Sequence, residues 1–188
     1  MILIAKTSLA LFVALAALAL AGCLSTQNEP FPLDGGDRIA AKPGDYACRS
    51  VDAQGVARIE PARLVRLSAN RRTQYVFLAP DNSDAEPVTL HRVSQGLYLV
   101  ALAHEEDPGE DLYLAAPAAD GASFRLYAPA PTPASADTLA ARNGAKLAHL
   151  QFSDTLSGPL AAQRAFALAL AADPKSWRIA ADCRAKRR

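Results

Sequence analysis

Residues 88–103 carry the pattern on which the predicted fold depends: VTLHRV at 88–93, the turn residues Ser94-Gln95-Gly96, and LYLVALA at 97–103. Both apolar runs are rich in β-branched, aromatic and aliphatic residues, and a short polar segment with a glycine separates them. This arrangement is typical of a β-hairpin. The second run is apolar at consecutive positions, which favours a central strand buried on both faces.

A similar pair of runs lies on each side of this hairpin. RLVRLS at 63–68 and TQYVFLA at 73–79 precede it, and LYLA at 112–115 and SFRLY at 123–127 follow it. Polar or turn-forming residues separate the members of each pair. Three consecutive hairpins predict an antiparallel β-meander of about six strands.

The chain after this meander has a different pattern. Three prolines at positions 129, 131 and 133 end the β-rich region, and capping and stop residues then predict helices over 135–143 and 157–172. A short strand is expected at 146–152, between the two helices. The predicted fold class is therefore α+β, with the meander followed by a helical C-terminal third.

The first 22 residues have the composition of a secretory signal peptide. Lys6 supplies a positive charge, and an uninterrupted apolar run from Leu9 to Ala21 follows it. A basic start, an apolar core and an exit of small residues define such a signal. The run is shorter than the roughly 20 apolar residues that a membrane span needs, although an uncleaved N-terminal anchor helix is the alternative.

Leu20-Ala21-Gly22-Cys23 resembles the lipobox of bacterial lipoproteins at all four positions, and the resemblance covers only the first 23 residues. It implies cleavage before Cys23 and transfer of a diacylglycerol to the Cys23 thiolate. Two or three acyl chains there would make membrane attachment effectively permanent. By resemblance to Gram-negative sorting, Leu24 rather than Asp after this cysteine implies the outer membrane.

With Cys23 acylated, Cys48 and Cys183 remain, and the oxidising periplasm favours a disulfide between them. Such a staple would close a long loop and contribute about 4–5 kcal/mol in the chain-entropy account. A free buried thiol and a redox pair are the alternatives. The sequence has no Cys-x-x-Cys, which argues against redox catalysis.

Four segments are expected along the chain. Residues 1–22 form the signal peptide, and the proline- and turn-rich residues 23–44 form a flexible tether. Residues 45–183 form a single β-rich domain, and the basic tail 184–188 is a solvated terminus or a weak contact with anionic lipid or lipopolysaccharide. After loss of residues 1–22 the chain has equal numbers of basic and acidic residues, which argues against nucleic-acid binding.

The sequence offers few candidates for chemistry. His91, His104 and His149 have no metal-ligand spacing, and the chain contains no serine elbow or glycine-rich phosphate loop. The acidic segment 104–107, with Glu110 and Asp111 close behind, could bind a cation or a basic partner. A solvated loop between hairpins is the favoured interpretation. We therefore expect no catalytic residue, no metal and no cofactor.

These observations favour a non-enzymatic, lipid-anchored envelope protein whose β-rich domain presents a surface to another envelope protein, to peptidoglycan or to an assembly machine. The alternative is a carrier of a small apolar ligand, in which the sheet curls around a cavity lined by leucine, valine and phenylalanine. A hydrolase would require one of the histidines to meet a carboxylate and a hydroxyl in one cleft.

Overall fold

The computed structural model describes residues 23–31, 36–39, 41–51, 56–69, 72–78, 85–103, 109–131, 133–150 and 153–186. The expected signal peptide at 1–22 lies outside these residues. His104 and the rest of the acidic segment 104–107 lie outside them as well.

Strands dominate the described residues, with two α-helices and one short 3-10 helix. The strands are β1 (Cys23–Thr26), β2 (Gly44–Val51), β3 (Ala57–Ala69), β4 (Arg72–Leu78), β5 (Ala85–Ser94), β6 (Leu97–Ala103), β7 (Glu110–Pro117), β8 (Ser123–Pro129), β9 (Lys146–His149), β10 (Ser153–Ser157) and β11 (Trp177–Ala185). The helices are α2 (Pro133–Asn143), α3 (Leu160–Ala171) and the 3-10 helix η1 (Pro174–Ser176).

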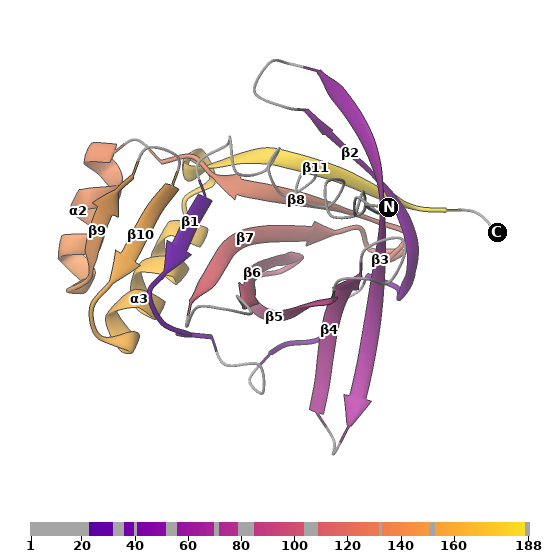
Figure 1. Cartoon of the computed structure of the whole chain (residues 1–188), viewed down its shortest axis with the longest axis horizontal. Coiled ribbons are helices and arrows are strands. Elements are labelled where there is room, and N and C mark those ends of the chain that lie inside the picture. The colour runs from indigo at the N-terminus through magenta and orange to yellow at the C-terminus, as the bar shows by residue number, and fades with distance from the viewer. Residues whose placement is uncertain are drawn as a thin grey trace, which may run out of the picture.

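Eight of the strands form a closed antiparallel barrel (Figure 1) in the order β6-β5-β4-β3-β2-β11-β8-β7, and β7 pairs back onto β6. Most neighbours in the barrel are joined by hairpins. The β5–β6 turn uses Gly96 at φ +74°, a backbone conformation that glycine adopts without a steric penalty. Closure depends on β11, which lies between β2 and β8 and pairs with both.

The α+β prediction is therefore wrong: the chain is mostly β, with a closed eight-stranded barrel and two helices in place of a meander with a helical third. The six strands expected between residues 63 and 127 are all present. The prediction lacked the strands β2 and β11. β11 pairs with β2 and β8, which are both distant in the sequence, so no local turn indicates these pairings. β2 also pairs with β3, but with its residues 57–64, most of which lie before the strand expected from residue 63.

Two separate apolar cores stabilise the protein. The first fills the barrel and includes Tyr46, Tyr75, Tyr98, Tyr113 and Phe124, each 1–6% exposed. The second lies outside the barrel, where the outer faces of β6 and β7 meet α3, β1 and β10. Along β6 and β7 the side chains alternate between these two cores, because successive residues of a strand point to opposite faces.

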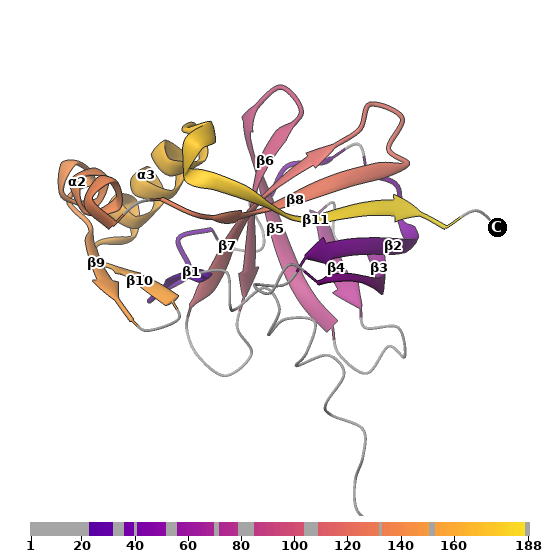
Figure 2. The same cartoon turned by 90° about the horizontal axis from the view of Figure 1, so that it is seen from above.

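The second core is covered by a small sheet and the helices, which lie together at one side of the barrel (Figure 2). β1 pairs in parallel with β10, and β9 pairs with β10 as a hairpin. α3 is rich in alanine and leucine, which are strong helix formers, and its buried residues include Phe166 and Leu170.

Residues 23–31 are part of this packing, so the flexible tether expected at 23–44 is wrong there. β1 is hydrogen-bonded to β10 and β7, Leu24 is 3% exposed, and Phe31 is fully buried. Further along, Ala41 is buried against the barrel core, and β2 already begins at Gly44. Tertiary contacts supply the apolar surface that the segment lacks on its own.

Candidate functional site

Cys23, the predicted lipidation site, is the first residue of β1 and lies opposite Ser153 of β10. The next residue, Leu24, is buried in the second core. Cys23 therefore leads directly into the folded body. Leu150 lies close by, because its N–H donates to the Ser153 carbonyl at 2.8 Å, and its side chain is 61% exposed.

Cys48 and Cys183 form a disulfide that joins β2 to β11. The two residues are directly opposite each other in the antiparallel pair, and Cys183 is fully buried. The bridge spans 135 positions of sequence and lies in the barrel wall, where β11 completes the circuit. It covalently holds the pairing on which closure depends.

Phe31, at the end of the described residues that follow β1, is held by barrel side chains through both of its backbone groups. The Phe31 N–H donates to Glu110 Oε2 at 3.1 Å, and the Thr89 hydroxyl donates to the Phe31 carbonyl at 3.1 Å. Glu110, Thr89 and Phe31 are all at least 98% buried. We call residues 23–31 the N-terminal strap.

Glu110 is the most strongly perturbed acid of this region. Burial raises its pKa from 4.5 to about 8, the hydrogen bond from the Phe31 backbone lowers it, and the nearby charge of Glu29 raises it. The Glu110 N–H also donates to the Thr26 hydroxyl at 3.0 Å, which ties the strap to β7 a second time. Sequence analysis placed Glu110 in a solvated acidic loop, and the structure instead buries it under the strap.

His91 lies under the same strap. His91 is 6% exposed, and the centre of its ring lies 4.7 Å from the centre of the Phe31 ring. Cζ of Arg164, on α3, lies 5.5 Å from the centre of the Phe31 ring. Burial and the charge of Arg164 lower the pKa of His91, while Asp37 raises it. Its Nε2 has no hydrogen-bond partner among the described atoms. The ring is thus a neutral packing group.

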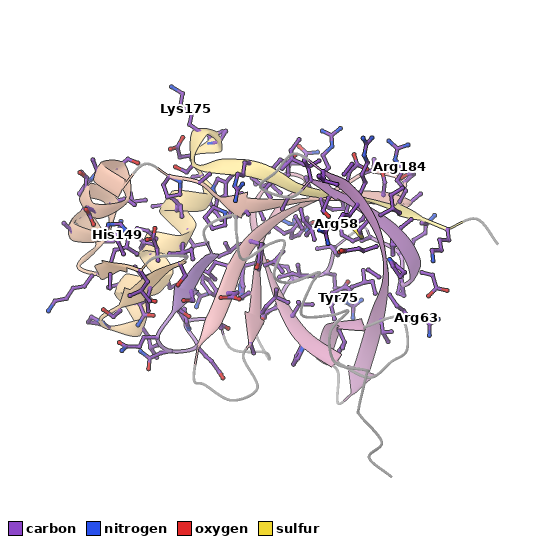
Figure 3. All side chains as sticks on the ribbon, turned by 45° about the horizontal axis from the view of Figure 1, so that its top comes forward. Arg58, Arg63, Tyr75, His149, Lys175 and Arg184 are labelled. Carbon is purple, nitrogen blue, oxygen red and sulfur yellow. A yellow bond between two sulfur atoms is a disulfide. The ribbon has the colours of Figure 1, made fainter. Side chains whose placement is uncertain are left out.

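His149 is held between two carboxylates at the edge of the small sheet (Figure 3). Its Nδ1 lies 2.7 Å from Asp154 of β10 and its Nε2 lies 3.1 Å from Asp137 of α2. The hydrogen bond to Asp154 raises the pKa of His149 most, and the hydrogen bond to Asp137 raises it further. Both ring nitrogens are engaged, so the histidine ties α2 to the sheet.

The described residues contain no group of three or more histidine, cysteine, aspartate or glutamate side chains placed to hold a metal ion. Trp177 packs against the second core, and its indole N–H donates to the Leu170 carbonyl at 2.8 Å. Arg184 and Ala185, which we assigned to the basic tail, are the last residues of β11. That boundary moves because β11 pairs with β2 as far as Ala185.

The side chains inside the barrel bear on the hypothesis that the protein carries a small apolar ligand. The described interior side chains are nearly inaccessible to solvent, and aromatic rings occupy much of the space. Tyr46 donates its hydroxyl to the Lys42 carbonyl, and the Ile39 N–H donates to the Tyr75 hydroxyl at 3.3 Å. The segment before β2 thus packs against these tyrosines. These described side chains pack together inside the barrel.

No protein-family model, curated protein or solved structure matches this chain. Among the described residues, neither helix is long and apolar enough to cross a bilayer.

Proposed function

We propose that this chain is a lipid-anchored cell-envelope protein, attached through acyl chains on Cys23, with its β-barrel serving as a non-enzymatic binding or structural module. The observation that carries the proposal is the match of Leu20-Ala21-Gly22-Cys23 to the lipobox. Cleavage before Cys23 would leave every described residue in the mature protein, since β1 begins at that cysteine.

Two further features support this proposal. The Cys48–Cys183 disulfide suits an oxidising compartment such as the periplasm. A closed β-barrel is a fold that binding modules and carriers use. Leu24 after the anchor favours the outer membrane over the inner one, and envelope proteins and peptidoglycan are the partners of first choice.

The arrangement of the described histidines supports a non-enzymatic role. His91 packs against Phe31, and His149 is bonded to Asp137 and Asp154 through its two nitrogens. Neither ring is thereby placed as a base beside a nucleophile, which acid–base catalysis would require.

Intact mass and membrane flotation test the anchor, with the wild type and Cys23→Ser expressed side by side in a Gram-negative host. We expect the wild type to lose residues 1–22, gain acyl mass and float with membranes, and the variant to do neither. The double variant Cys48→Ser/Cys183→Ser is the matched control, because it removes two other cysteines and should keep the acyl mass. Equal masses without acylation in the wild type would refute the anchor.

The closed barrel favours one second candidate, a carrier of a small apolar ligand. Such a ligand would lie among the buried side chains of the barrel core, which include Tyr98 and Val100. Native mass spectrometry of the protein purified from its envelope distinguishes the two. We expect no bound apolar molecule, and a stoichiometric one would favour the carrier.

A further inference from the structure

Part of the barrel's outer surface has none of the described helices and none of the strands β1, β9 and β10 packed against it. It is formed by parts of β8, β11, β2 and β3; β8 and β11 run from the helical end of the molecule toward the opposite end, where β2 and β3 lie (Figure 2). Side chains alternate along these strands, so the neighbours of the inward-facing Phe124, Cys183 and Tyr46 point outward. The register aligns Arg125, Asp182, Arg49 and Ile59 in one row across the four strands.

We call this surface the basic face. It consists of five cations, two acids and three aliphatic residues: Arg49, Arg63, Arg125, Arg184, Lys186, Asp45, Asp182, Val51, Ile59 and Ile179.

The basic face has three more positive than negative charges, although the chain after residue 22 has no formal net charge. Its acids are already engaged within the face. Asp45 pairs with Arg63 at 2.5 Å, and Asp182 lies 3.5 Å from Arg125 and 3.4 Å from Arg184. Arg184 is 79% exposed. The charge of the protein is therefore distributed unevenly, and this side attracts anions.

The same face exposes three aliphatic side chains among its cations. Ile59 is 72% exposed, Ile179 61% and Val51 58%. Exposed aliphatic groups surrounded by arginine match the boundary between acyl chains and anionic headgroups in a bilayer, where both kinds of side chain find partners.

The position of Cys23 relates this face to the proposed anchor. In Figure 1, β1 begins toward the upper side of the molecule, along which β11 also runs, whereas Figure 2 shows the two strands apart in the perpendicular view. Leu150, beside Ser153 and hence beside Cys23, adds an exposed aliphatic group at this position. Because Leu24 is buried, acyl chains on Cys23 would hold the body against the bilayer without a spacer.

We infer that the basic face lies on an anionic phospholipid surface and, together with the acyl chains on Cys23, fixes the orientation of the barrel on the membrane. This inference rests on the proposed lipid anchor. Each arginine or lysine near an anionic leaflet strengthens binding by about fivefold, and about 1 M salt abolishes the contribution by screening. Anionic lipid is favoured over an acidic protein because one surface combines the charge with exposed aliphatic groups, and because the proposed anchor on Cys23 holds the body at a bilayer.

Arginine footprinting of the mature acylated protein tests the orientation. The protein is reconstituted into vesicles of phosphatidylcholine alone or mixed equally with phosphatidylglycerol, treated with phenylglyoxal, and mapped by peptide mass spectrometry. We expect the anionic vesicles to slow modification of Arg49 and Arg184 by at least about threefold, and high salt to reverse the protection. Arg142, exposed in the last turn of α2, is the matched control and should react equally in both vesicles.

The outcomes separate the two proposals. If the protein carries acyl mass but Arg49 and Arg184 react equally in both vesicles, the orientation is wrong and the anchor stands. If no acyl mass is present, the anchor is wrong, and the same footprint with unacylated protein added to the vesicles tests the face alone. Protection in native membranes without protection on phosphatidylglycerol would assign the face to an acidic protein partner and overturn the lipid assignment.

Discussion

The Phe31 N–H donates to Glu110 Oε2 at 3.1 Å, across 79 positions of sequence. The Thr89 hydroxyl donates to the carbonyl of the same phenylalanine, so side chains on the barrel's outer surface satisfy both backbone groups of one buried residue. An extended segment outside a sheet normally relies on water for these hydrogen bonds. Here the barrel supplies them, which is why the N-terminal strap can be buried.

Phe31→Ala should strongly destabilise the protein. The ring is fully buried in the second core, and removing such a ring typically costs about 3–5 kcal/mol. Leu160→Ala, at a position 52% exposed on α3, is the control and should change the free energy of unfolding by less than about 0.5 kcal/mol. Chemical denaturation measures both. Equal stability of the two variants would mean that the strap does not pack.

Glu110 should make stability fall as the pH rises. Its pKa is 4.5 when exposed and about 8 in the fold, so between these values the folded state binds more protons than the unfolded state. The contribution is fully present below about pH 4.5 and is lost as the pH rises through about 8. The loss is on the order of several kcal/mol.

Glu110→Gln isolates this effect, because the amide oxygen can still accept the Phe31 N–H and the side chain no longer titrates. Urea denaturation across the pH range should show the wild type losing stability relative to the variant from mildly acidic to mildly alkaline pH. Parallel curves for the two proteins would contradict the raised pKa.

Removing the disulfide should cost about 5 kcal/mol in the chain-entropy account, since the bridge spans 135 positions. Cys48→Ala/Cys183→Ala avoids leaving one free thiol. Guanidinium denaturation of this variant, compared with the wild type with and without reductant, measures the loss. If reductant destabilises the wild type and the variant equally, its effect does not come from this bridge.

His149 should remain protonated at higher pH than an ordinary histidine, because Asp154 and Asp137 accept from its two ring nitrogens. The charged ring therefore stabilises the fold below the unfolded pKa of 6.5, and this contribution is lost as the pH rises through the higher folded value. An NMR titration of the ring protons measures the pKa directly. Asp154→Asn should lower it more than Asp137→Asn, and no change in either variant would show that the carboxylates do not act on the ring.

Local pattern was sufficient for the six strands between residues 63 and 127 and for the two helices, but not for the β2–β3 and β9–β10 hairpins. The β5–β6 pair is encoded by two apolar runs and the glycine between them, because antiparallel neighbours joined by a short turn pair with little loss of chain entropy. The Phe31 site could not be predicted in the same way. Its surroundings in the sequence are polar and rich in proline, and its partners Glu110 and Thr89 lie far along the chain.

The sequence by itself determined the six strands between residues 63 and 127 and the two helices after them, since these depend on short-range periodicity and turn residues, but it did not predict β10. It also left Cys48 and Cys183 as the cysteines to pair once Cys23 was assigned to the lipobox. Only the tertiary structure decided that β11 closes the barrel against β2, that the strap is buried, and that cations from four strands share one face. Those features join residues that are far apart in the sequence, in one case by 135 positions. Their stability comes from side chains that meet only after the chain has folded.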